Sequence, residues 1–253
     1  MPGARRPPGA ARPHAGAAAP RLAAMTAERS KEAAGRAALA LVEDGMRVGL
    51  GTGSTARWFT QAVGDAVRGG LRVRAVASSD RTAALARELG IPIVDLDAEG
   101  LDLAVDGADL VDPALRLVKG GGGAQVREKV VAAAARRFVV VADESKLVAR
   151  LRGPVPVEIL PFGSAATLAA LERCGAAFRM RSSPAGRPLT SDSGNLLGDG
   201  WFGVIEDPED LARRLDAIPG VVGHGLFLGM ADLVLVGDEA GGVRELRRRE
   251  PVE

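Results

Sequence analysis

Short apolar runs alternate with amphipathic stretches over the first half of the chain. Five of the runs have the length of buried strands. They lie at residues 46–50, 71–77, 91–96, 101–105 and 138–142. Four other stretches carry apolar residues at helical spacing. They lie at residues 26–44, 56–68, 81–89 and 124–137. Strands that alternate with helices in this way predict an α/β fold, with a doubly wound, mainly parallel sheet of the Rossmann-like type.

The pattern changes at Pro154, where prolines begin to interrupt an extended run. Short strands are predicted at 154–161, 178–181 and 201–205, and helices at 164–174 and 207–217. The last helix opens with Asp207 and Pro208, residues that favour a helix start. We therefore predict a second, smaller α+β domain at residues 153–225.

The remaining segments are expected to return to the first sheet. Residues 225–228 and 233–237 have the pattern of strands, and the charged end of the chain, 243–253, is expected to fray. The larger α/β domain would then consist of residues 26–152 and 226–253.

The first 24 residues differ in composition from the rest of the chain. They are mainly Pro, Ala, Gly and Arg and contain no acidic residue. Such a segment cannot bury enough apolar surface to become ordered. We expect residues 1–25 to form a disordered leader, or Met25 to be the real beginning of the protein.

Composition excludes several classes of function. Hydrophobic residues make up 47%, which permits a sizeable core, and 33 basic residues balance 32 acidic ones. With no basic excess and only 3% aromatic residues, a nucleic-acid partner is not expected. No apolar run approaches the ~18 residues that span a bilayer, so no membrane partner is expected. The single cysteine, Cys174, excludes an intrachain disulfide and a thiolate zinc cluster.

A turn rich in glycine and hydroxyl residues follows the first predicted strand. It consists of Gly51, Thr52, Gly53, Ser54 and Thr55 and leads directly into a helix. Backbone N–H groups and hydroxyls at a helix start can hold a phosphate. Ser54 or Thr55 can equally cap the helix with nothing bound. The turn is neither a Walker loop nor a full G-x-G-x-x-G, so both interpretations stay open at this point.

A second glycine-rich turn separates the apolar run 115–118 from the helix predicted at 124–137. Lys119 precedes four consecutive glycines, and Glu128 follows nine residues after the lysine. Such a turn lets N–H groups approach an anion. A cation and a carboxylate beside it are suited to proton transfer on a phosphorylated or carbonyl-bearing ligand. The alternative is a turn that only needs positive φ, with Lys119 and Glu128 solvated.

Polar clusters also end further strands, at residues 78–80, 106–109 and 143–146. The carboxyl ends of strands in a doubly wound sheet form the usual ligand-binding edge, so these clusters predict a site for an anionic ligand. Asp106 and Asp109 could instead form turns or cap helices. They could also bind a metal, but no histidine joins them and two lysines are expected in the same cleft.

This ordered set of motifs resembles one family, ribose-5-phosphate isomerase, type A, from about residue 31 to residue 237. The segments that carry the resemblance are Gly-Thr-Gly-Ser-Thr-Ala at 51–56, Ser-Ser at 78–79, Asp-Gly-Ala-Asp at 106–109, Lys-Gly-Gly-Gly at 119–122, Arg-Glu-Lys at 127–129 and Asp-Glu-Ser-Lys at 143–146. Segments 154–161, 191–195 and 220–227 also fit, whereas the leader does not.

The resemblance implies an enzyme that interconverts D-ribose 5-phosphate and D-ribulose 5-phosphate through an enediolate, with no cofactor and no metal. It implies Glu128 as the base, Lys119 as the group that stabilises the oxyanion, and Asp106 as an aid to ring opening. Ser54, Thr55, Lys31 and Lys146 would hold the phosphate. The full set of implied substrate-binding residues is Lys31, Thr52, Gly53, Ser54, Thr55, Asp106, Gly107, Ala108, Asp109, Lys119, Gly120, Gly121, Gly122 and Lys146.

The resemblance further implies a cytoplasmic homodimer or homotetramer of the non-oxidative pentose phosphate pathway. Two other functions compete with this interpretation. A sugar-phosphate-sensing domain of a transcription regulator would keep the phosphate loops but would not need Glu128 and Lys119. An enzyme similar to a coenzyme A transferase would use Glu128 as a nucleophile and would usually be a longer chain.

Overall fold

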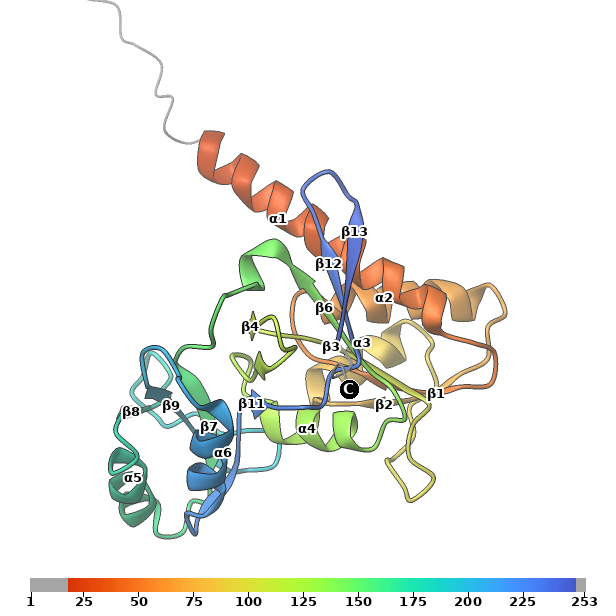
Figure 1. The fold of residues 1–253 in the computed structure, drawn as a ribbon. Coiled ribbons are helices and arrows are strands. Elements are labelled where there is room, and N and C mark those ends of the chain that lie inside the picture. The colour runs from red at the N-terminus through yellow and green to blue at the C-terminus, as the bar shows by residue number, and fades with distance from the viewer. Residues whose placement is uncertain (1–17, 249–253) are drawn as a thin grey trace, which may run out of the picture.

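A six-stranded sheet forms the centre of the protein (Figure 1), for which a computed structural model describes residues 18–248, with side chains from Met25 onward. The strand order is β13-β12-β6-β3-β1-β2, and every neighbouring pair is parallel except β12 and β13. The strands are β1 (Arg47–Leu50), β2 (Arg74–Ala77), β3 (Leu103–Gly107), β6 (Phe138–Asp143), β12 (Leu233–Gly237) and β13 (Val243–Arg247). The predicted doubly wound, mainly parallel sheet is confirmed.

Helices cover both faces of this sheet, since side chains of the central strand β6 alternate between two cores. Val139 and Val141 pack in one core with residues of α1, α2 and α3, whereas Val140 packs in another core with Val131 of α4. Full burial of one such side chain stabilises the fold by about 1.5–3 kcal/mol. The helices are α1 (Ala18–Ala37), α2 (Ala56–Arg68), α3 (Asp80–Glu88) and α4 (Gln125–Ala133), with 3-10 turns η1 (Ala38–Leu41) and η2 (Glu144–Lys146).

A four-stranded antiparallel sheet forms a smaller second layer, in the order β10-β7-β9-β8 (Figure 1). Its elements are β7 (Val155–Ile159), α5 (Ser164–Glu172), β8 (Ala177–Met180), β9 (Leu196–Trp201), α6 (Pro208–Asp216) and β10 (Val221–His224). Val157, Leu171 and Leu215 share its core. The predicted capping of α6 is confirmed, because the Asp207 side chain accepts a hydrogen bond from Asp210 N. A smaller α+β region is therefore present, and its exact boundaries stay a prediction.

A short three-stranded sheet, β11-β5-β4, lies beside these two sheets. It contains β4 (Leu110–Val111), β5 (Leu117–Val118) and β11 (Leu226–Phe227). The prediction that residues 225–228 return to the large sheet was wrong, because Leu226 pairs with Val118 instead. This pairing brings the chain at Gly225 against Lys119, whose N–H donates to the Gly225 carbonyl at 2.8 Å.

Two predicted strands are not where the pattern indicated. Residues 91–96 form only an isolated bridge between Ile93 and Ala75 at the edge of the sheet, since Pro92 has no N–H to extend a ladder. The strand predicted at 201–205 instead ends at Trp201, and Gly203 turns the chain there with a φ of +64°.

Helix and strand ends also differ from the predictions. Helix α1 begins at Ala18, inside the predicted leader, and Pro20 falls in its first turn, where proline is tolerated. Residues 1–17 lie outside the described residues. The C-terminal segment predicted to fray forms β13, although residues 249–253 also lie outside that range. Helix α4 ends at Ala133 rather than 137, because Arg136 N donates to the carbonyl of Leu101.

Candidate active site

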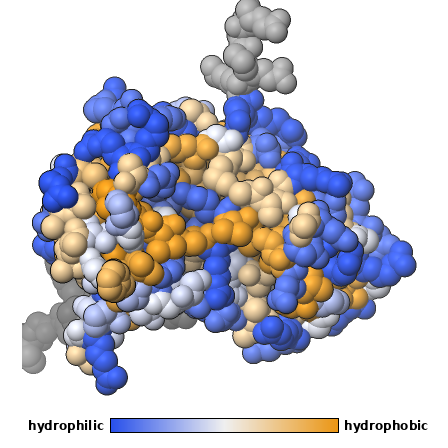
Figure 2. Space-filling model, turned by 90° about the horizontal axis from the view of Figure 1, so that it is seen from below, coloured by the Kyte–Doolittle hydropathy of each residue, from blue (hydrophilic) through white to orange (hydrophobic). Residues whose placement is uncertain are grey.

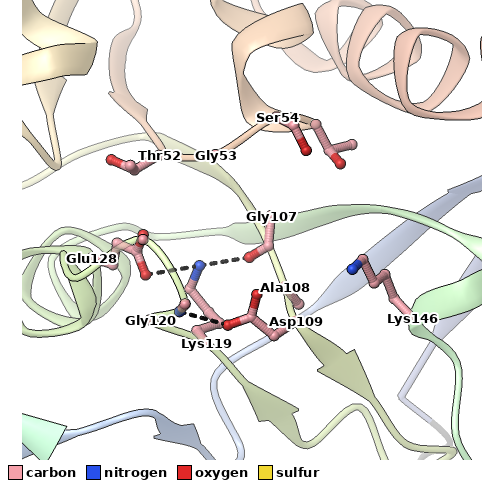
Figure 3. A pocket seen from close by; sticks show the side chains of 13 residues that line it. Thr52, Gly53, Ser54, Gly107, Ala108, Asp109, Lys119, Gly120, Glu128 and Lys146 are labelled. Carbon is pink, nitrogen blue, oxygen red and sulfur yellow. Dashed lines mark hydrogen bonds and ion pairs between the residues drawn. The ribbon is translucent and has the colours of Figure 1, made fainter. Parts of the chain in front are cut away.

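Three buried charged side chains meet at the carboxyl edge of the large sheet. Lys119 Nζ lies 3.2 Å from Glu128 Oε2 and donates a 2.6 Å hydrogen bond to the Gly107 carbonyl (Figure 3). It also lies 3.0 Å from Asp106 Oδ2. Only 2–4% of each of these three residues is exposed. One ammonium therefore contacts two carboxyl groups in a setting from which water is largely excluded.

Each of the three residues comes from a different element. Asp106 ends the central strand β3, Lys119 follows β5 directly, and Glu128 lies near the start of α4. The chain runs from β1 to β2 on one side and then crosses to β3 on the other side of β1. Asp106 is thus beside the point at which the strand order reverses, which is where doubly wound sheets bind ligands.

Burial determines the protonation behaviour of the group. Desolvation, reinforced by the negative charge of Asp106 and opposed by Lys119, raises the pKa of Glu128 to about 8. Desolvation also raises the pKa of Asp106, against the opposing effect of Lys119. Burial lowers the pKa of Lys119, but the two carboxylates outweigh it and leave the pKa above its usual value. A carboxylate whose pKa lies near neutrality is suited to accept and return a proton.

The turn after β1 holds Asp106 in place. Asp106 Oδ1 accepts hydrogen bonds from Thr52 N at 2.9 Å and from Gly107 N at 2.7 Å. The Thr52 hydroxyl contacts the hydroxyls of Ser78 and Ser79 at 2.9 and 2.7 Å. Ser78 and Ser79, which were predicted to belong to the ligand-binding edge, are therefore buried behind Thr52 and do not line the cavity.

Gly51 leaves no room for a side chain beside this carboxylate. A Cβ at Gly51 would lie 2.2 Å from Asp106 Oδ1 and 2.5 Å from Asp106 Cα. We expect Gly51→Ala to lower the free energy of unfolding by about 1–3 kcal/mol, the usual cost of overpacking, and to reduce activity by displacing Asp106. Urea denaturation gives the stability. Gly69→Ala is the control, because the nearest atom to its Cβ lies at 3.3 Å. Wild-type stability and activity of Gly51→Ala would contradict the prediction.

The second glycine-rich turn wraps around the same point. Gly120 has a φ of +102°, which favours glycine over any other residue. Gly121 N donates to Asp109 Oδ2 at 2.7 Å (Figure 3). Asp109, which lies between β3 and β4, therefore fixes the position of this loop. This loop faces the turn at residues 51–55 across a cavity that Gly122 and Thr52 both line.

A cavity of about 90 Å³ opens beside Lys119 and Glu128. It is lined by Thr52, Gly53, Ser54, Thr55, Gly107, Ala108, Asp109, Lys119, Gly120, Gly121, Gly122, Glu128 and Lys146. Lys146 approaches from η2, across the cavity from Glu128 (Figure 3). Asp106, predicted to bind substrate, does not line the cavity and contacts one of its lining residues, Lys119. Lys31 is on α1, 3.8 Å from Glu28, and does not line the cavity.

Two features of this site have no counterpart in the sequence patterns. The Phe227 ring lies under two ammonium groups, with Lys119 Nζ 5.3 Å and Lys129 Nζ 5.0 Å from its centroid, so it supports the cation by a cation–π contact. Arg181 donates to the carbonyls of Gly120 and Gly121 from the smaller sheet region. Phe227 ends a segment that fits the resemblance, and Arg181 ends a predicted strand, but no pattern in the sequence indicates the contacts that either residue makes.

The described part of the chain shows neither a metal-type cluster nor a membrane helix. Between Met25 and residue 248 no three His, Cys, Asp or Glu side chains gather in a way that could hold a metal ion. In the same range no helix is long and apolar enough to cross a membrane.

Comparison with known proteins identifies relatives over most of the chain. The family model for ribose 5-phosphate isomerase A (phosphoriboisomerase A) matches residues 74–241. The ribose-5-phosphate isomerase A of Thermomicrobium roseum is 53% identical over 232 residues, which cover 90% of this chain and 98% of that protein. The Agrobacterium fabrum protein of the same name is 50% identical over 225 residues, covering 86% and 97%.

Solved structures give the same result. The ribose 5-phosphate isomerase A of Methanocaldococcus jannaschii superposes with a TM-score of 0.81 at 40% identity, covering 86% of this chain and 97% of that one. A D-ribose-5-phosphate isomerase in complex with phospho-erythronic acid superposes with a TM-score of 0.82, also at 40% identity, with the same coverage.

Proposed function

Because the chain belongs to the ribose 5-phosphate isomerase A family and is an aldose-ketose isomerase, we propose that Glu128, Lys119 and Asp106 carry its reaction. The reaction interconverts D-ribose 5-phosphate and D-ribulose 5-phosphate in the non-oxidative branch of the pentose phosphate pathway. The observation that supports these roles is the buried contact of Lys119 with both carboxylates, at 3.0 and 3.2 Å.

Glu128 acts as the base. It removes the proton from C2 of the open-chain aldose and returns it to C1. The hydroxyl proton passes from O2 to O1 at the enediolate stage, so the carbonyl moves from C1 to C2. Negative charge develops on the substrate oxygens between the two transfers, and Lys119 Nζ stabilises it because the ammonium is already desolvated and fixed. Asp106, whose pKa burial raises, aids the ring opening that precedes these transfers.

The phosphate is bound at the far end of the cavity. Ser54 and Thr55 precede the 13-residue helix α2, whose N-terminal N–H groups and dipole favour an anion. Lys146, on η2, lines the same cavity and adds a positive charge. Lys31 would join this site by swinging away from Glu28, because their 3.8 Å pair is partly exposed and weak. Asp109 and the backbone of residues 107–108 and 120–122 face the sugar hydroxyls.

A relative of this fold is known with phospho-erythronic acid, whose planar carboxylate resembles an enediolate in shape and charge. We propose that this chain binds the same compound with the carboxylate at Lys119 and the phosphate at Ser54 and Thr55.

We further propose that the enzyme is a cytoplasmic homodimer or homotetramer. Figure 2 shows apolar side chains gathered in a band across one face of the molecule. Among large apolar side chains, Phe162 is 88% and Trp201 is 53% exposed. Exposed apolar surface of this kind favours self-association. Sedimentation equilibrium checks this, and the mass of a single chain would contradict it.

The reaction itself is tested by ketose formation from ribose 5-phosphate with the purified protein in the presence of EDTA. We expect turnover that chelation does not reduce, because protein side chains supply both the base and the positive charge. Absence of turnover, with thermal stabilisation by sugar phosphates, would favour the sensing-domain alternative.

The rate is expected to depend on pH through Glu128. The base must be ionised to accept a proton, and burial raises its pKa to about 8. kcat/KM should therefore rise with pH through an inflection near pH 8 and fall about tenfold for each unit below it, as for any single ionisation. A profile that is flat between pH 6 and 9 would contradict Glu128 as the base.

A further inference from the structure

One charged side chain of the smaller region contacts the catalytic loop directly. Arg181 Nη1 donates to the Gly120 carbonyl at 3.0 Å and to the Gly121 carbonyl at 3.2 Å. Arg181 follows β8, and these two hydrogen bonds join the four-stranded sheet to the glycine-rich turn after Lys119. None of the roles assigned so far uses this arginine.

The arginine is itself held in a fixed orientation. Its Nε and Nη2 donate to Asp199 Oδ2 and Oδ1 at 2.8 and 2.6 Å, a bidentate pair with side chains only 16% and 22% exposed. Its backbone is paired on both sides, with Leu197 O and with Leu189 N. A planar guanidinium fixed in this way presents its remaining N–H groups in a definite direction.

The two hydrogen bonds determine where the loop N–H groups point. In a trans peptide the C=O and N–H groups lie on opposite sides, and among the described residues only the Gly153-Pro154 bond is cis. The Gly120 carbonyl faces Arg181, and the N–H of the same peptide, that of Gly121, reaches Asp109 Oδ2 on the other side. By the same geometry, the Gly121 carbonyl faces Arg181 and the Gly122 N–H points away from it.

Gly122 lines the cavity together with Lys119 and Glu128. Within residues 25–248 its N–H donates no hydrogen bond, unlike the N–H groups of Gly121 and Gly123. A fixed, unused backbone donor next to a buried lysine is suited to stabilise developing negative charge on a bound ligand.

We propose that Arg181 is a positioning residue for the isomerisation: held by Asp199, it orients the peptide between Gly121 and Gly122 so that the Gly122 N–H donates to a substrate oxygen that becomes negative in the enediolate. This inference rests on the proposed function of the site. It assigns the smaller α+β region a part in the reaction.

The test compares Arg181→Ala and Arg181→Lys with a matched control, Arg179→Ala. Arg179 lies two residues earlier on β8, has an exposed side chain and is not placed in the site. For Arg181→Ala we expect kcat to fall by about 10- to 100-fold, somewhat less than the loss of a whole oxyanion-hole donor, with KM within about threefold of wild type. Inhibition by phospho-erythronic acid should weaken in parallel with kcat. Arg181→Lys should not recover the rate, because one ammonium cannot keep both the Asp199 pair and the two carbonyls.

Added guanidinium ion distinguishes positioning from folding. At millimolar concentrations it should restore part of the Arg181→Ala rate and leave wild type and Arg179→Ala unchanged. Asp199→Asn, which leaves Arg181 in place without its bidentate charged partner, should show a smaller loss of kcat in the same direction. A kcat of Arg181→Ala within about twofold of wild type, an effect on KM alone, or a loss that guanidinium does not restore would each overturn the proposal. Failure of the proposed function would differ from these results, because wild type itself would then be inactive on ribose 5-phosphate.

Discussion

Glu128→Gln is expected to lower kcat by about 10²–10⁴, the usual contribution of a general base, while KM changes little. The amide keeps the shape of the carboxylate but cannot accept the C2 proton at neutral pH. The contacts that bind the phosphate lie on other elements, at Ser54, Thr55 and Lys146, so substrate should still bind.

Steady-state kinetics and a binding titration with phospho-erythronic acid check this prediction. Glu172→Gln, an exposed glutamate at the end of α5, serves as the matched control and should retain wild-type turnover. A Glu128→Gln enzyme with more than about a tenth of wild-type kcat would show that another group moves the proton.

Lys119→Met should lower kcat by about 10²–10³, comparable to removal of an oxyanion-hole donor. Among the residues with described side chains, Lys119 is the one cation in contact with both Asp106 and Glu128. Its loss leaves the enediolate charge without its main partner. It also leaves two buried carboxylates close together with no positive charge between them.

The pH dependence of the Lys119→Met enzyme gives a second readout. Lys119 lowers the pKa of Glu128 against burial, so its removal should raise that pKa further above 8. The deficit should therefore be larger at pH 7 than at pH 9. Lys129→Met is the control, because Lys129 contacts the same Phe227 ring but neither carboxylate. An unchanged pH profile would contradict the effect of Lys119 on the pKa of Glu128. An increase in KM alone would make Lys119 a phosphate-binding residue instead.

Sequence patterns predicted that polar strand ends would meet at one edge of the sheet, because the carboxyl ends of parallel strands converge; the individual binding residues were implied by the family resemblance and stay a prediction. Asp106 lies at the end of β3 and Lys146 follows β6, which is its neighbour in the sheet, and the turn at 51–55 follows β1. The predicted proximity of Lys119 and Glu128 is confirmed at 3.2 Å. Lys31 does not line the cavity, so its part in phosphate binding depends on a side-chain movement and stays a prediction.

The contacts that the patterns could not predict come from tertiary pairing. Residues 225–228 have the alternation of any short strand, and only their pairing with β5 places Phe227 under Lys119. Arg181 appears as one polar residue after a short strand, and its role depends on how the smaller sheet packs against the loop. The run at 91–96 has strand-like composition, but Pro92 at the sheet edge prevents a regular ladder.

The central claim is that Glu128 transfers a proton between C1 and C2 by way of an enediolate. The most direct measurement is NMR of ribose 5-phosphate and ribulose 5-phosphate equilibrated in D₂O with EDTA, using the wild-type and Glu128→Gln enzymes. We predict that wild type forms the ketose and introduces solvent deuterium at C1 of the ketose and C2 of the aldose, and that the variant introduces it about 10²–10⁴ times more slowly. Ketose formation without deuterium after prolonged equilibration, or exchange by the variant at the wild-type rate, would contradict the claim.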